Sequence, residues 1–131
     1  MNTAVALHKS QLVALTNQDA TVTVLLQPAY LYKTEGQPGL DFGTVWLQDV
    51  QLVFREASLD GTLPALPGRI ASGHFTADSE QWENFIPVST STTAPCQLHL
   101  TFGTSHELTI HAKAIHITLL DEPLFLELFK P

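Results

Sequence analysis

Apolar and polar residues alternate along most of the chain, with the period of two that is typical of β-strands. Between residues 21 and 27, Val22, Val24 and Leu26 share one face, and threonines and a glutamine occupy the other. Pro28 cannot donate a hydrogen bond to a neighbouring strand, so it ends this strand, kinks it or places it at an edge.

The strongest strand pattern, between residues 44 and 57, changes phase in its middle. Val45 and Leu47 are odd-numbered, whereas Val50, Leu52 and Phe54 are even-numbered. A β-bulge near Gln48 and Asp49 would bring both sets onto one face. The alternative keeps Trp46 in phase with the later residues and buries Gln48.

Three shorter sequence patterns in the middle of the chain predict turns or irregularities. The dipeptide Asp60-Gly61 is typical of a hairpin turn. Gly73, inside a strand pattern, indicates a bulge or a close approach of another segment. Asp78 begins the one place where a short helical turn is expected, because it can cap such a turn and Gln81 can close a capping box.

Residues 96–102 and 107–112 predict a hairpin joined by a three-residue loop. The two apolar faces match if Leu100 lies opposite Leu108 and His99 lies opposite Thr109. The phase of the pattern then switches, which predicts a bulge or bend near Lys113 and Ala114.

Glu122-Pro123 is expected to break the chain before a last strand at residues 124–129, which is apolar on both faces except at Glu127. If its three leucines face the core, Phe125 and Phe129 point outward around Glu127. Exposed aromatic side chains can mark a protein interface. We therefore predict an interface, to a second copy or another protein, at Phe125, Glu127 and Phe129.

These patterns predict an all-β fold of seven to nine short strands with bulges and at most one short helical turn. The 131 residues suit one domain spanning positions 1–131. No repeat of fixed period is present, so an antiparallel sandwich or a closed or partly open barrel is expected.

The charge and cysteine content of the chain limit the classes of partner and the cellular location that we expect. The chain has 6 basic and 13 acidic residues, a formal net charge of −7, and its basic residues are scattered. Such a field repels phosphate, so nucleic acid and anionic membrane surfaces are not expected as partners. A single cysteine, no recognisable signal peptide and no long apolar run together predict a cytoplasmic protein.

A metal site is one candidate for chemistry. In the hairpin register above, His99 and His111 are diagonal neighbours on the polar face, about 7–8 Å apart at their Cβ atoms, and Glu107 is the other diagonal neighbour of His99. Two imidazoles and a carboxylate can bind a metal. The competing interpretation is that these are ordinary solvent-facing side chains, since no close spacing such as H-x-H occurs.

The remaining candidates have ordinary explanations. Asp78, Glu80 and Glu83 could coordinate Ca²⁺, although the first turn of a helix would explain them equally well. Cys96 shares the parity of the core residues, which indicates a buried thiol rather than a nucleophile. Four aromatic residues could line a cavity for a small apolar ligand (Tyr30, Tyr32, Trp46 and Trp82). No cofactor-binding motif is present, so no cofactor is expected.

Two hypotheses for function follow. The favoured one is a small, non-catalytic binding or protein-interaction module. The alternative is a small-ligand-binding barrel or a metal-dependent enzyme that uses the face formed by His99, His111 and Glu107.

Overall fold

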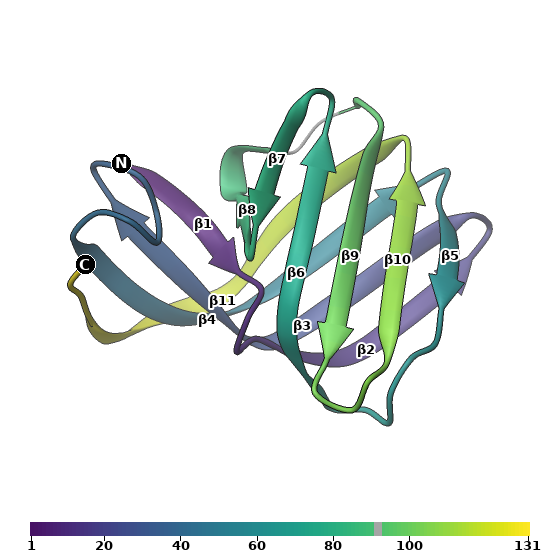
Figure 1. Ribbon diagram of the computed structural model, residues 1–131, viewed down its shortest axis with the longest axis horizontal. Coiled ribbons are helices and arrows are strands. Elements are labelled where there is room, and N and C mark those ends of the chain that lie inside the picture. The colour runs from purple at the N-terminus through teal and green to yellow at the C-terminus, as the bar shows by residue number, and fades with distance from the viewer. Residues whose placement is uncertain (91–92) are drawn as a thin grey trace.

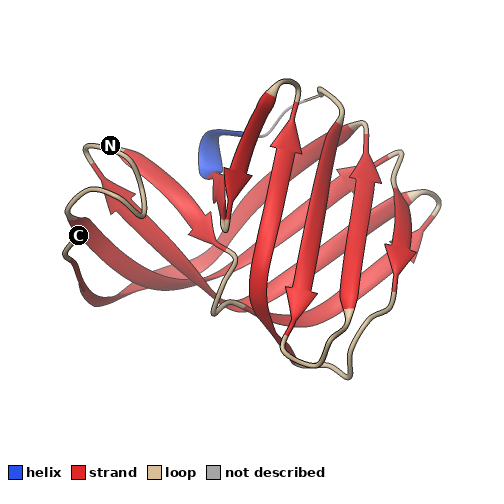
Figure 2. Cartoon of the chain, in the orientation of Figure 1, coloured by secondary structure: helices blue, strands red, loops and turns tan. Residues whose placement is uncertain are grey.

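The computed structural model describes residues 1–90 and 93–131, and in this part of the chain it confirms the all-β fold. The described residues form eleven strands, more than the seven to nine expected, and one short 3₁₀ turn (Figure 1; Figure 2). The elements are β1 (Asn2–Ala6), β2 (Gln11–Gln18), β3 (Thr21–Thr34), β4 (Gly43–Arg55), β5 (Ser58–Gly61), β6 (Gly68–Ala77), β7 (Glu80–Glu83), β8 (Phe85–Pro87), η1 (Val88–Thr90), β9 (Cys96–Phe102), β10 (Glu107–Ala112) and β11 (Ala114–Phe129).

The strands form one antiparallel sheet in the order β11-β4-β3-β2-β6-β9-β10-β5, with β7 beside β6, and β1 between β3 and β8. The sheet folds over where β2 pairs with β6, so that a front layer of β7, β6, β9, β10 and β5 covers a back layer of β2, β3, β4 and β11 (Figure 1). The sheet does not close on itself. The fold is therefore a sandwich or partly open barrel, and the closed barrel that the sequence left open is not formed.

The core lies between the two layers. Even-numbered residues of β4 and β9 point into it, including the fully buried Phe54 and Leu98, and Phe75 of β6 packs with them. The predicted hairpin register is confirmed, because Leu108 pairs with Leu100 and Thr109 pairs with His99. Burying these side chains supplies most of the stability, at about 1.5–3 kcal/mol for each large residue.

Part of the back layer extends beyond the front layer. We call this part the arm, and define it as β1, residues 29–34 of β3, residues 43–47 of β4 and residues 124–129 of β11. We call the two-layered remainder the body. Figure 1 shows the arm reaching to the left of the body, with β1 beside β3 and the yellow end of β11 along its lower border.

The boundary between arm and body is marked by bulges on both sides of β4, at the level of Gln48. In β3, Leu26 pairs with Val50 and Ala29 pairs with Gln48, so Gln27 and Pro28 form a bulge. Pro28 thus kinks the strand rather than ending it, and β3 continues for 14 residues.

In β11, Leu120 pairs with Asp49 and Leu124 pairs with Leu47, so residues 121–123 bulge out. The side-chain amide of buried Gln48 donates a hydrogen bond of 2.9 Å to the backbone oxygen of Asp121 in this bulge. The sheet therefore bends here because both neighbours of β4 carry extra residues while β4 carries none.

This arrangement decides between the two predictions for β4. The bulge expected near Gln48 and Asp49 is wrong, because β4 keeps one phase and its even-numbered residues, from Thr44 through Trp46 to Phe54, share a face. The alternative, in which Gln48 is buried, is correct. The partner strands supply the irregularity that we had assigned to β4.

Two other turn predictions need correction. The helical turn expected at Asp78 is instead a hairpin, in which Asp78 adopts a left-handed φ of 56° and Ala77 pairs with Glu80. Asp tolerates this conformation, and pairing lets Trp82 stack on the core residue Phe75. The strand pairing and the Trp82–Phe75 contact therefore determine the local structure here, and the capping pattern does not.

Asp60-Gly61 is not a hairpin turn but lies inside β5, where Gly61 pairs with Leu108. Gly61 has a φ of 103°, and a Cβ there would lie 2.1 Å from the backbone oxygen of Glu107, so the close pairing requires glycine.

The phase switch near Lys113 and Ala114 is confirmed as the corner where the chain leaves the front layer for the back one. The break expected at Glu122-Pro123 is absent, because β11 runs through it as one 16-residue strand. Gly73 lies close to another segment, as one of its two interpretations required: a Cβ there would lie 2.5 Å from Cδ1 of Leu7.

Candidate functional site

The end of β11 in the arm exposes more apolar surface than any other strand segment that the structure describes. Four large apolar side chains of this segment are exposed to solvent, with exposed fractions of 66 % for Leu124, 53 % for Phe125, 43 % for Leu126 and 50 % for Leu128. The condition that the three leucines face the core is therefore not met. The front layer does not reach this far, so nothing in the described structure covers them (Figure 1).

A second bulge separates the predicted interface residues onto two faces of the arm. Phe125 pairs with Trp46 and Glu127 pairs with Val45, which leaves Leu126 as an extra residue between them. Phe125 therefore lies on one face, and Glu127 and Phe129 lie on the other. Strict alternation predicts an outward orientation for all three residues because it does not reveal a one-residue insertion.

On the first face, Phe125 and Trp46 meet edge to face with ring centroids 5.4 Å apart. The indole N–H of Trp46 donates to Oγ1 of Thr44 at 2.8 Å, and the ammonium of Lys33 lies 4.7 Å from the indole centroid. These contacts fix Trp46, so the exposed ring of Phe125 rests on a rigid support.

On the second face, Phe129 packs on Tyr32, with ring centroids 5.3 Å apart, and Tyr32 meets Phe85 at 5.2 Å. Burial raises the pKa of Tyr32, and the charge of Glu127 raises it further. His8 lies at the base of this cluster, 5.5 Å from Phe85. Burial lowers the pKa of His8; the backbone of Asn84 opposes this change and Lys9 reinforces it.

The candidate metal residues lie on the outer face of the front layer, but only two of them contact each other. Nε2 of His99 lies 3.1 Å from Oε1 of Glu107, and its Nδ1 lies 2.7 Å from Oγ1 of Thr109. His111 is directed to Asp60, with 3.4 Å between Nε2 and Oδ2. Among the described residues, no group of three or more His, Cys, Asp and Glu side chains is placed to hold a metal ion. The three-residue site stays a prediction.

The same face carries a third histidine–carboxylate pair that the sequence did not indicate. His74 pairs with His99 across β6 and β9, and its Nδ1 contacts Oε1 of Glu83 on β7. Only the strand order could have revealed it, because β6, β7 and β9 become neighbours through pairings that the pattern leaves open.

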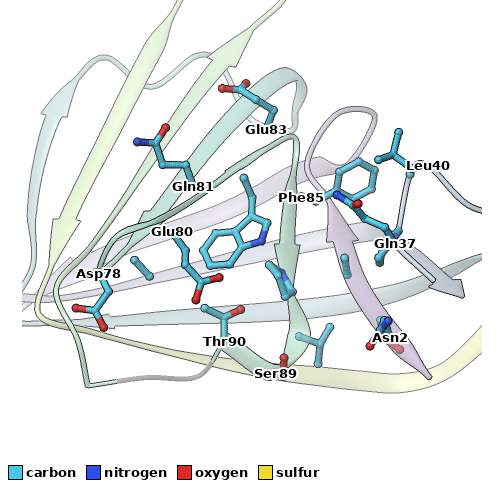
Figure 3. Close-up of a pocket in the computed structure, with 18 of the residues that line it drawn as sticks. Asn2, Gln37, Leu40, Asp78, Glu80, Gln81, Glu83, Phe85, Ser89 and Thr90 are labelled. Atoms are coloured by element: carbon cyan, nitrogen blue, oxygen red, sulfur yellow. The ribbon is translucent and has the colours of Figure 1, made fainter. Parts of the chain in front are cut away.

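A groove lies between β7, η1, β8 and the start of β1, with a volume of about 1090 Å³. Figure 3 shows Asp78, Glu80 and Thr90 near one end and Asn2, Gln37 and Leu40 near the other. All three carboxylates of the acidic run border it, together with Trp82. Of the four aromatic residues expected to share a cavity, only Trp82 lines this groove: Tyr30 and Tyr32 pack on one face of the arm, and Trp46 lies on the other.

Cys96 is buried in the core, as its parity predicts. Burial raises the pKa of its thiol to about 11. Because the thiolate is the reactive form, this cysteine is a poor nucleophile at neutral pH.

A comparison of the chain with protein-family models, with curated proteins and with solved structures finds no match. In the part of the chain that the structure describes, no helix has the length and hydropathy needed to span a bilayer. Function is therefore inferred from the residues and contacts above.

Proposed function

We propose that the chain is a non-catalytic protein-interaction module that binds a second copy of itself through the open edge of β11 in the arm. The observation that carries this proposal is the position of residues 124–129, which form the outermost strand of the arm and expose four large apolar side chains. A strand edge with unpaired backbone groups and apolar side chains can add a strand from another chain.

Two other edge strands, β5 and β7, are shielded in ways that this one is not. β5 and β7 have four residues each and carry charged side chains, Asp60 on the first and Glu80 and Glu83 on the second. Short, charged edges resist strand addition. Between Leu124 and Phe129, by contrast, the chain has one charge, at Glu127, and no proline or lysine.

The sequence of β11 is complementary to itself. If two copies pair antiparallel with Leu126 opposite Leu126, then Leu124 lies opposite Leu128. The same register places Glu122 opposite Lys130 at both ends of the ladder. The register that centres on Glu127 would oppose two like charges, which is unfavourable. The register also places Phe125 opposite Glu127, so the match between two copies comes from the leucines and from the Glu122–Lys130 pairs.

Other features support a binding role over a catalytic one. Cys96 is buried with a raised thiol pKa, and the imidazoles of His99 and His111 contact different carboxylates. A free, buried thiol also suits a reducing compartment, so we extend the proposal to a cytoplasmic location.

Sedimentation equilibrium of the untagged protein between about 1 and 100 µM tests the proposal. We expect a dimer that Phe125→Asp converts to a monomer, because the proposed register places the new carboxylate opposite Glu127 of the second copy. Phe42→Asp is the matched control, since Phe42 is equally exposed, at 57 %, but lies outside β11. It should stay dimeric. Circular dichroism checks that both variants are folded.

The register has its own test. Lys130→Glu should weaken the dimer several-fold by opposing it to Glu122, and adding Glu122→Lys should restore it. A monomeric wild-type protein at 100 µM, or a folded Phe125→Asp variant that remains dimeric, would contradict the proposed function.

A further inference from the structure

We propose that the groove between β7, η1 and β1 binds a linear organic cation of the polyamine type. The site is separate from the β11 edge, and the inference does not depend on self-association. It rests on the groove, on the charges along it, and on an indole held in a fixed orientation beside two carboxylates.

The groove has a volume of about 1090 Å³, which is at the upper end of the range for small-molecule sites. Its ionisable side chains are Asp78, Glu80 and Glu83, and none of the described residues that line it is Lys, Arg or His. The α-amino group of Met1 borders the far end and lies 3.9 Å from Glu35. The negative charge is thus concentrated at the end near β7, where a cation is favoured.

Strand pairing places the carboxylates of Glu80 and Glu83 on opposite sides of β7. Glu80 and Trp82 pair with Ala77 and Phe75, whose side chains face the core, so both point to the inner side of β7. Glu83 points to the outer side, where it contacts His74. Figure 3 shows Glu80 directed toward Thr90, Asp78 to the left of it at the same end of the groove, and Glu83 well apart from both.

Neither the Asp78 nor the Glu80 carboxylate has an ion-pair or hydrogen-bond partner among the residues that the structure describes, so both are available to a ligand. Trp82 lies beside them. Its indole stacks on Phe75 with ring centroids 5.6 Å apart and an interplanar angle of 26°, which fixes it in the wall of the groove. An ammonium group between these carboxylates and the indole gains charge attraction and a cation–π contact.

The rest of the lining favours an extended cation over a metal ion. Ser89 and Thr90 offer hydroxyl oxygens, and Gln37 and Asn2 offer amide oxygens toward the far end. These groups can accept hydrogen bonds from further ammonium groups along a chain. Two carboxylates without a third ligand are a poor metal site, and no described group of three such side chains is placed to hold a metal.

Isothermal titration calorimetry with spermidine at about 20 mM salt tests this inference. We expect one molecule to bind per chain, and the double variant Asp78→Asn/Glu80→Gln to bind at least tenfold more weakly. Asn is suited to the left-handed φ of Asp78, so the hairpin is retained. The matched control is Asp60→Asn/Glu107→Gln, which removes the same charge from the outer face of the front layer and should bind spermidine like the wild type.

Trp82→Leu supplies a second measurement, because it removes the indole and leaves both carboxylates. We expect severalfold weaker binding, with sedimentation behaviour the same as that of the wild type. The inference is overturned if spermidine gives no heat at millimolar concentration. It is also overturned if both double variants lose affinity equally, which would indicate diffuse attraction to a protein of net charge −7, or if neutral maltotriose binds in place of spermidine.

Discussion

The body and the arm share three strands, β3, β4 and β11, but they use them differently. In the body these strands form one wall of a core, and residues such as Val24 and Leu52 are fully buried by the front layer. In the arm, Leu31 of β3 is still fully buried in the core, but the end of β11 has no opposing layer and its phenylalanines make only local ring contacts. The body therefore stabilises the sheet, and the arm presents it to a partner.

The comparison shows that alternation along a strand predicts which side chains share a face of the sheet, but not whether that face is buried. Phe54 and Phe125 occupy similar pleated positions on adjacent strands, yet the first is fully buried and the second is 53 % exposed. The difference comes from the front layer, which ends between them. Three experiments can break or sharpen this contrast.

Truncating the two phenylalanines should have the largest effect. Phe54→Ala should lower the free energy of unfolding by about 3–5 kcal/mol, because it leaves a cavity in the core. Phe125→Ala should cost about 1 kcal/mol or less, since it loses mainly the contact with Trp46. Urea unfolding of each variant at low micromolar concentration measures both values, and equal costs would show that the arm is packed as tightly as the body.

Thiol labelling compares the two regions in the native state. The buried thiol of Cys96, with its pKa of about 11, should react with a disulfide reagent at pH 7.5 at least a hundredfold more slowly than a cysteine introduced by Leu40→Cys in the exposed loop between β3 and β4, next to the arm. Cys96→Ala serves as the background for the second measurement. Rates within tenfold of each other would mean that the core near β9 opens readily.

Acidification should have the smallest effect, and it acts at the base of the arm. Burial lowers the pKa of His8 below the 6.5 of an ordinary histidine, so the unfolded chain takes up this proton more readily than the folded one. The contribution of neutral His8 to the free energy of unfolding is therefore fully present above about pH 6.5 and is lost as the pH falls below that value.

His8→Phe should reduce this loss, because a ring of similar shape remains beside Phe85 without a titrating group. Urea unfolding of both proteins at pH 7.5 and pH 5.5 gives the comparison, and the other five histidines are common to both. An identical loss in the variant would assign the pH dependence to other groups.

The sequence predicted the body better than the arm, for a physical reason. Within the β9–β10 hairpin, two matching apolar faces and a short loop leave one register, and His99 opposite Thr109 follows from it. In the arm, residues 124–129 are apolar on both faces, so their pattern is equally consistent with burial, and only the extent of the front layer decides. The groove was beyond reach because β7, η1 and β1 come together through the fold, although the acidic run and Trp82 were visible as residues.

The bulge at residues 121–123 also has an evolutionary consequence. Residues 121–123 lie opposite the single residue Gln48, so the bulge adds an even number of residues to β11. The side chains before and after the bulge therefore continue to alternate between the same two faces. Loss of one codon here would turn every following side chain of β11 over, so that Phe125 and Phe129 would exchange the faces of the arm on which they lie, while the core of the body is unchanged. Loss of two codons would shorten the strand but keep its surfaces. A gene of this kind can thus acquire a new binding specificity in one in-frame step, while the fold that carries it stays the same.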